Sequence, residues 1–207
     1  MANNDKLKIK IIIGSIRKSR FGDKAAQFIF EETKKRDDMN VEIIDLMDYP
    51  LPLFNEPISP SRITTGKYDN PVVQKWADKI GEADGYIIVT PEYNHGYPAA
   101  LKNALDHVYY PWNKKAVGFV AYGSVGGARS VEQLREVTIE LQMAPIRTGI
   151  HIPFQVMMEI FNKKEGDKID HFLAFRQQAG DFLSQLAWWT RALKNAREAE
   201  KSKNAPL

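Results

Sequence analysis

Cysteine is absent from this chain of 207 residues. Its absence excludes disulfide bonds, zinc sites built on cysteine and catalysis by a thiol. No hydrophobic run approaches the length of a membrane span, and the polar segment before residue 8 has no features of a signal peptide. We therefore expect a cytoplasmic protein with no membrane partner and no metal site.

The chain also has little net charge. Its 29 basic and 26 acidic residues leave a formal charge of +3, which is too small to indicate nucleic acid as a partner. The clearest basic run, between residues 8 and 24, surrounds a loop where a bound phosphate would explain it better. The length fits a single domain, 1–207, with a core from about 8 to 196 and a charged end, 197–207, that we expect to fray.

Two glycine motifs for phosphate binding are missing. The pattern G-x-x-x-x-G-K-[ST] does not occur, which argues against a nucleoside triphosphatase. The pattern G-x-G-x-x-G does not follow the first predicted strand, so an NAD-dependent dehydrogenase loses its main support.

Five apolar segments alternate with helical patterns. The predicted strands are 8–13, 41–46, 85–90, 116–122 and a weaker one at 146–152 that Gly149 interrupts, and a last helix is expected over about 168–196. Nearly continuous apolar strands indicate burial on both faces. The sequence therefore predicts an α/β three-layer sandwich, a flavodoxin-like doubly wound five-stranded parallel sheet in the order 2-1-3-4-5.

In such a sheet, ligands bind beyond the carboxyl ends of the strands, at the point where the strand order reverses. The first loop there offers hydroxyl and guanidinium donors from Ser15, Arg17, Ser19 and Arg20 and then opens a helix. Free N–H groups at a helix start and paired donors of arginine favour a terminal phosphate. The alternative is a basic turn that is only solvated.

Two more loops reach the same edge. The segment 91–98 combines tyrosines, an amide and a carboxylate, which suits the face and edge of a flat ring, although the tyrosines could simply cover the sheet. His95 has no nucleophile beside it, so we assign no catalytic side chain. The glycine-rich segment 123–127 would let backbone N–H groups approach a ligand, or would be an ordinary turn.

Together the three loops resemble the NADPH-dependent FMN reductase family, which includes quinone, azo and chromate reductases. The residues that carry the resemblance are Gly14-Ser-x-Arg17, the run Pro91-Glu-Tyr-Asn-His-Gly-Tyr-Pro-Ala-Ala-Leu-Lys-Asn-Ala-Leu-Asp106, and 123–127, within a match over about 8–152. The resemblance implies FMN as the bound cofactor, with site residues Ser15, Arg17, Ser19, Arg20, Phe21 and Gly22 for the phosphate and Pro91, Glu92, Tyr93, Asn94, Gly123, Ser124 and Gly127 for the ring. Many members have serine where this chain has Arg20, so either Ser19 or Arg20 would hold the phosphate.

The resemblance further implies an enzyme that passes hydride from NADPH or NADH through FMN to a small acceptor, such as a quinone, an azo compound, chromate or flavin. The alternative is a flavodoxin-like electron carrier without reductase activity. Related proteins are homodimers or homotetramers. Five aromatic residues could form such an interface or equally belong to the core: Tyr109, Tyr110, Trp112, Trp188 and Trp189. The segment 50–70 is long for a loop in a compact domain, and such loops often have a function.

Overall fold

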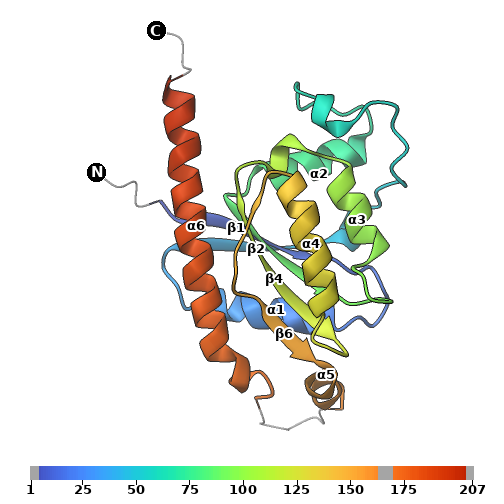
Figure 1. Ribbon diagram of the computed structural model, residues 1–207, viewed down its shortest axis with the longest axis vertical. Coiled ribbons are helices and arrows are strands. Elements are labelled where there is room, and N and C mark those ends of the chain that lie inside the picture. Colours follow the sequence, from blue (N-terminus) through green and yellow to red (C-terminus); the bar gives the residue numbers. More distant parts are fainter. Residues whose placement is uncertain (1–4, 163–169, 204–207) are drawn as a thin grey trace.

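Strand β1 (Leu7–Ile13) lies inside a parallel sheet whose strands follow the order β2-β1-β3-β4-β5. The computed structural model describes residues 5–162 and 170–203 and shows helices on both sides of this sheet (Figure 1). The other main strands are β2 (Met39–Asp45), β3 (Gly85–Pro91) and β4 (Ala116–Gly123). The order predicted from the sequence is confirmed.

The fifth predicted strand is divided into two pieces that both pair with β4. These are β5 (Ala144–Pro145) and β6 (Ile150–Pro153). Between them, the backbone bonds to side chains of the covering helices: Gln185 accepts from the N–H of Thr148, and Arg135 donates to the carbonyl of Arg147. The interruption predicted at Gly149 is therefore present. The backbone groups on either side of it form hydrogen bonds with side chains of α4 and α6, which cover opposite faces of the sheet.

Two hydrophobic clusters fill the spaces on either side of the sheet. One contains Ile11 and Ile13 and is covered by α1 (Gly22–Thr33), α5 (Phe154–Phe161) and α6 (Arg176–Lys203). The other contains Ile12 and is covered by α2 (Pro71–Gly81), α3 (Ala99–Asp106) and α4 (Ala128–Glu140). Strand alternation sends neighbouring residues of β1 to opposite layers.

Short 3₁₀ helices complete the secondary structure at Leu46–Asp48, Pro60–Arg62, Tyr110–Trp112 and Leu173–Phe175. In the described ranges, no helix is both long enough and apolar enough to cross a membrane.

The C-terminal region differs from the prediction in two ways. Helix α5 was not expected at all. Helix α6 starts at Arg176 rather than near 168 and continues to Lys203 rather than ending near 196. Its end is held because Arg197 donates to the carbonyl of Lys114 and lies 3.3 Å from Asp84, while the Lys114 ammonium is 2.6 Å from Glu200. The predicted residues 168 and 169 and the end 204–207 lie outside the described residues.

The aromatic residues considered for an interface separate into two groups. Trp112 is fully buried and packs edge-on against Trp76 and Tyr86, so of the two alternatives left open by the sequence it belongs to the core. Trp188 and Trp189 lie exposed on α6. The hydrophobic cluster beneath α2 accommodates the indole ring of Trp112, and the sequence pattern alone could not show this packing.

Gly118 in β4 gives a stability test of the packing under α6. A Cβ added there would stand 2.5 Å from two ring carbons of Phe182. We expect Gly118→Ala to lower the free energy of unfolding by about 1–3 kcal/mol, because the buried ring must move. Chemical denaturation measures the change.

The matched control is Gly180→Ala in the interior of α6, where an added Cβ would meet no heavy atom of the described chain within 4 Å apart from the neighbouring backbone of its own helix. It should raise the free energy of unfolding by about 0.5–1 kcal/mol, since alanine favours the helix. Equal stability of the two variants would contradict the packing described here.

Candidate functional site

A cavity of about 330 Å³ opens at the carboxyl ends of β1, β3 and β4. All three loops selected from the sequence contribute to its wall, together with α5. The lining residues are Arg17, Ser19, Arg20, Phe21, Pro91, Glu92, Tyr93, Tyr122, Gly123, Ser124, Phe154, Met157 and Phe161. The other predicted site residues, Ser15, Gly22, Asn94 and Gly127, lie in the same loops but not on the cavity surface.

Ser15 joins the first two loops. Its buried hydroxyl is 2.8 Å from the hydroxyl of Tyr93 and accepts a hydrogen bond of 3.3 Å from the backbone N–H of Arg17. The first loop therefore turns around the Ser15 side chain, and Tyr93 is held against it. This contact fixes one corner of the cavity.

The two arginines of the first loop have different environments. The Arg20 side chain is buried, forms a two-pronged ion pair with Asp45 and also binds Asp23 and the carbonyl of Ser15. The hydrogen bonds that Arg20 donates to Asp45, and then those to Asp23, hold the pKa of Arg20 above its ordinary value despite burial. Arg17, in contrast, is exposed at the cavity. Most of the Arg20 donors are thus committed to the protein, whereas Arg17 is exposed and lines the space where a ligand would lie.

The first turn of α1 begins directly after Phe21, which lines the cavity next to Arg20. Phe21 precedes the helix and packs edge-on against Tyr122, with the ring centres 5.1 Å apart. Within the described ranges, no side chain caps the first turn. The N–H groups at a helix start carry a partial positive charge, so this turn can receive an anion.

Tyr122 is a site residue that the sequence did not indicate. Its buried hydroxyl lies beside Gly22, where an added Cβ would stand 3.0 Å from the oxygen. In the described part of the chain the proton of this hydroxyl has no acceptor within hydrogen-bond distance. Burial, and then the neighbouring Tyr93, raise the pKa of Tyr122, so the phenol stays protonated and keeps a proton to donate. A buried polar atom without a partner beside a helix start is what an anion site would use.

The second loop makes a tight turn between Tyr93 and Gly96, whose backbones exchange hydrogen bonds of 2.8 and 3.0 Å. Asn94 and His95 adopt left-handed conformations, with φ of 49° and 68°. Both side chains are exposed, and Asn94 does not line the cavity. Asparagine here is explained by its tolerance of this conformation, so its position supports a structural role in the turn.

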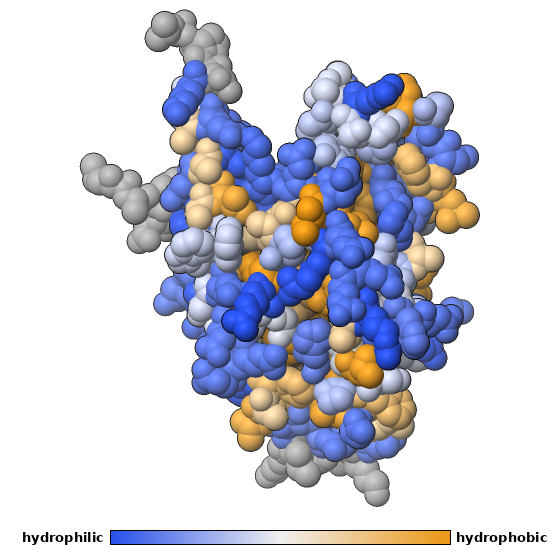
Figure 2. Space-filling view, in the orientation of Figure 1, coloured by the Kyte–Doolittle hydropathy of each residue, from blue (hydrophilic) through white to orange (hydrophobic). Residues whose placement is uncertain are grey.

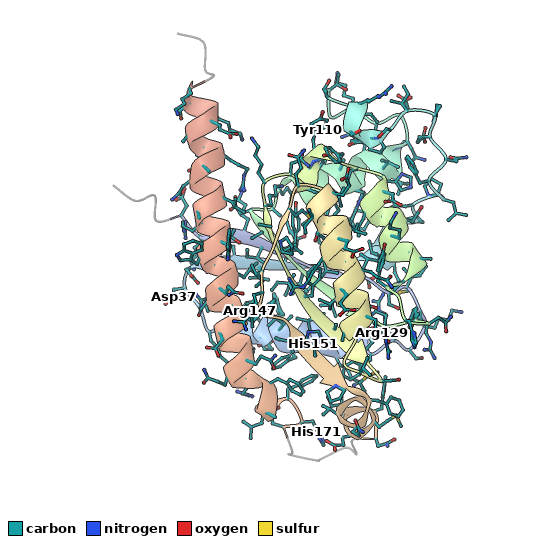
Figure 3. All side chains as sticks on the ribbon, in the orientation of Figure 1. Asp37, Tyr110, Arg129, Arg147, His151 and His171 are labelled. Atoms are coloured by element: carbon teal, nitrogen blue, oxygen red, sulfur yellow. The ribbon has the colours of Figure 1, made fainter. Side chains whose placement is uncertain are left out.

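Helix α4 fastens this turn. The Ser130 hydroxyl lies 2.9 Å from the carbonyl oxygen of Pro91 and 2.7 Å from that of Gly96. The Glu92 carboxylate accepts from the backbone N–H of Arg129 at 3.1 Å and from its guanidinium at 2.6 Å. Figure 3 shows Arg129 at the start of α4. The side chain of Glu92 is only 6% exposed. The charge of Glu92 is thus neutralised by Arg129, and the residue ties the loop to the helix.

The third loop needs its glycines for backbone reasons. Gly126 and Gly127 have φ of 67° and 74°, and a Cβ on Gly127 would stand 2.7 Å from the Cβ of Ala121. The carbonyl of Gly126 lies 3.0 Å from Nδ1 of His151, a residue of β6 labelled in Figure 3. Gly127 therefore shapes the turn, whereas Gly123 lies on the cavity surface.

Helix α5 supplies an apolar wall that the prediction missed. Phe154, Met157 and Phe161 line the cavity, and Phe161 packs edge-on against Phe21 at 5.5 Å. Hydrophobic side chains gather around α5 at the lower end of the molecule (Figure 2). The spacing of three and four residues between these positions is a helical signal that was present in the sequence. Among the described residues, no cluster of acidic or histidine side chains could hold a metal ion.

Known proteins resemble this chain in sequence and fold. The family model for NADPH-dependent FMN reductase matches residues 7–156. The sequence is 38% identical over 181 residues to an NAD(P)H-dependent FMN reductase of Schizosaccharomyces pombe, covering 86% of this chain and 90% of that protein. It is 33% identical over 148 residues to an NAD(P)H:quinone oxidoreductase of Solanum tuberosum, covering 69% and 73%. The fold is similar to that of a flavoenzyme NAD(P)H:(acceptor) oxidoreductase from Paracoccus denitrificans, with a TM-score of 0.68, 20% identity and coverage of 90% and 98%.

Tyr122 and Tyr86 form a matched pair of buried tyrosines for a test of the free hydroxyl. The Tyr86 hydroxyl lies 2.8 Å from the carbonyl oxygen of Ile80 and 3.0 Å from that of Pro111. In protein stripped of cofactor, we expect Tyr122→Phe to leave the free energy of unfolding unchanged or to raise it by about 1 kcal/mol, because no hydrogen bond is lost. Tyr86→Phe should lower it by about 1–3 kcal/mol.

Urea unfolding of both variants measures the difference. A loss for Tyr122→Phe as large as that for Tyr86→Phe would mean that the Tyr122 hydroxyl already has a partner within the protein.

Proposed function

The chain belongs to the NADPH-dependent FMN reductase family, and we propose that it binds FMN in the cavity described above and reduces a small quinone with electrons from NADPH or NADH. It is an NAD(P)H-dependent oxidoreductase of the FMN reductase and quinone reductase type. One observation supports the cofactor site above the others. The uncapped start of α1 and the exposed Arg17 lie at the same sheet edge as a wall that suits a flat ring.

The phosphate end is supported by charge and by the free hydroxyl. Arg17 and Ser19 present a guanidinium and a hydroxyl to the cavity, and the first turn of α1 adds N–H groups. Tyr122 has a proton without an acceptor in the described part of the chain, beside Gly22. These groups would hold the phosphate of FMN. Arg20 holds the loop in shape, because its donors bind Ser15 and Asp45. The sequence left either Ser19 or Arg20 as the residue that holds the phosphate, and we propose Ser19.

The ring end is supported by shape and polarity. Pro91 and Tyr93 form one wall, and Phe154 and Met157 form an apolar wall from α5. Gly123 and Ser124 bring backbone close to the cavity. A flat, mostly apolar ring with a polar edge fits such a site, because its faces contact hydrocarbon while its edge reaches backbone donors.

When bound, FMN supplies the hydride chemistry, since its ring accepts a hydride and passes it on. The protein residues bind, orient and shield. The side chains of α5 keep water from one side of the cavity. The Arg129 guanidinium neutralises the Glu92 carboxylate, so the wall does not present an unpaired negative charge to a ring that gains electrons. We assign no side chain as a catalytic acid or base.

A quinone is the acceptor that the relatives favour. Proteins named NAD(P)H:quinone oxidoreductase and 2-hydroxy-1,4-benzoquinone reductase are 33% and 30% identical to this chain. We also propose a cytoplasmic homodimer or homotetramer, and the exposed Trp188 and Trp189 on α6 support a contact between subunits.

The alternative is a flavodoxin-like electron carrier. Purified protein with added FMN should oxidise NADPH or NADH continuously when 1,4-benzoquinone is present, because each cycle returns the cofactor to its oxidised state. Absorbance at the nicotinamide band measures the rate. A single stoichiometric oxidation, or none, with both nicotinamides would support the carrier and reject the enzyme.

Arg17→Ala tests the phosphate site. We expect the Kd for FMN to rise about 10- to 100-fold, which corresponds to the loss of a charged hydrogen bond. The Kd for riboflavin, which lacks the phosphate, should change little. Fluorescence titration of stripped protein with both flavins measures the ratio.

Two controls separate contact from support. Lys18→Ala removes a neighbouring charge that does not line the cavity and should leave both affinities nearly unchanged. Asp45→Asn weakens the ion pair of Arg20 and should lower the free energy of unfolding as well as the affinity for FMN, because it loosens the first loop, whereas Arg17→Ala should leave the free energy of unfolding nearly unchanged. An unchanged FMN-to-riboflavin ratio in Arg17→Ala would reject the phosphate assignment.

A further inference from the structure

Helix α5 runs along one side of the cavity at the carboxyl ends of β1, β3 and β4, which we call the cofactor cavity. In the sheet register, Pro153 directly before α5 lies beside Gly123, at the end proposed for the ring. At the other end of α5, Phe161 packs edge-on against Phe21 at 5.5 Å, next to the first turn of α1. Figure 1 shows α5 directly after β6. Phe154, the first residue of α5, therefore lies at the ring end of the cavity.

The 91–96 loop and the start of α5 lie on opposite sides of β4. Strands β3 and β6 pair with the two edges of β4, so that Pro91 lies beside Tyr122 and Pro153 lies beside Gly123. Two strand spacings, about 10 Å, therefore separate the backbones of Pro91 and Pro153. Gly123 has no side chain that could fill the space between them. A flat molecule that lies over the end of β4 thus meets the 91–96 loop on one side and α5 on the other.

These two walls differ in how firmly the protein holds them. The 91–96 loop is bonded to α4, because the Ser130 hydroxyl donates to the carbonyl of Pro91 at 2.9 Å. Phe154, in contrast, is 51% exposed. In the described ranges no side chain caps the first turn of α5, and Ile160 is the only buried residue of this helix. The Phe154 side chain can therefore turn aside for an entering molecule, whereas the loop keeps its place.

The side chain of Phe154 is also suited to a particular kind of molecule. Because Phe154 lines the cavity itself, a ligand of that cavity covers its exposed ring. Aromatic rings favour contact with other flat, unsaturated rings in offset or edge-on arrangements. A hydrated inorganic anion has no apolar face and gains nothing from such a contact.

We propose that Phe154 packs on the ring of the quinone while the quinone is reduced, and that it thereby selects flat, unsaturated acceptors. This inference rests on the proposed function and identifies a residue that determines its substrate class. The quinone takes up two electrons and two protons and becomes a hydroquinone. The reduced nicotinamide supplies both electrons and one proton as hydride, and solvent supplies the second proton. Phe154 itself does not react.

The test compares two acceptors with the FMN-loaded enzyme. The first, 1,4-benzoquinone, offers a flat ring, whereas ferricyanide is an inorganic anion that takes up one electron per ion. Phe154→Ala should lower kcat/KM for benzoquinone about 10-fold, mainly through a higher KM, because the contact with the ring is lost. It should not lower kcat/KM for ferricyanide.

Two further variants separate the ring contact from general effects on α5. Phe154→Tyr keeps an aromatic ring and should retain the efficiency of the parent enzyme with benzoquinone. Met158 is 38% exposed on the same helix but does not line the cofactor cavity. Met158→Ala should therefore leave kcat/KM unchanged for both acceptors.

Two binding measurements do not depend on turnover. The product 1,4-benzohydroquinone, added without oxygen to the oxidised FMN-loaded protein, should bind about 10-fold more weakly to Phe154→Ala than to the parent. The change in flavin absorbance on titration measures this Kd. The Kd of stripped protein for FMN should rise less than about threefold, because the phosphate groups and the 91–96 wall are unchanged.

Four results would overturn the inference. In the first, Phe154→Ala reduces benzoquinone as efficiently as the parent enzyme. In the second, it loses the same factor with benzoquinone and ferricyanide. In the third, its Kd for FMN rises as much as its kcat/KM for benzoquinone falls. In the fourth, it forms smaller species than the parent in analytical ultracentrifugation, which would make Phe154 a contact between subunits.

Failure of the proposed function gives a different result. A parent enzyme that reduces benzoquinone with neither nicotinamide would reject the proposed function, and with it this inference. A parent enzyme that reduces benzoquinone, together with any of the four results, would reject the role of Phe154 alone.

Discussion

The buried guanidinium of Arg20 connects three separate parts of the chain. It bonds the carbonyl of Ser15 in the first loop, Asp23 in the first turn of α1 and Asp45 at the end of β2. Asp45 in turn accepts from the N–H of Met47 and so starts the segment that leads into the long loop. Removing Asp45 would leave the buried guanidinium paired with the exposed carboxylate of Asp23, which compensates its burial less well. The shape of the first loop, and with it the outline of the cavity that Arg17 and Ser19 line, depends on this network.

Helix α4 stabilises the opposite side of the cavity at the carboxyl ends of β1, β3 and β4. Its first turns hold the 91–96 loop through Arg129, Ser130 and Gln133, and the helix itself begins where the glycine loop ends. Two walls of the cavity therefore move with one rigid element. A site held in this way loses little conformational freedom when it binds a ligand, so more of the contact energy appears as affinity.

The long loop between β2 and α2 is ordered by side chains of neighbouring elements. The carbonyl of Pro52 lies 2.8 Å from Nδ2 of Asn103 and from Nε2 of His107, and the hydroxyl of Tyr110 donates to the carbonyl of Ser61 at 2.9 Å. These bonds satisfy a backbone that has no sheet to join. They leave Leu53 and Met47 exposed at the surface, so a segment without regular structure still has a defined conformation.

The sequence by itself determined the parallel sheet, its strand order and the three loops of the cofactor site, because apolar period, turn residues and chain connectivity are local properties. Only the tertiary structure separated Arg17 from Arg20, since the partner of Arg20 is 25 residues away in Asp45. It alone placed the hydroxyl of Tyr122 beside Gly22 and brought α5 to the site. The role of a side chain depends on whether groups far away in the sequence neutralise its charge, bury it or leave it exposed. The residues next to it in the sequence do not contain this information.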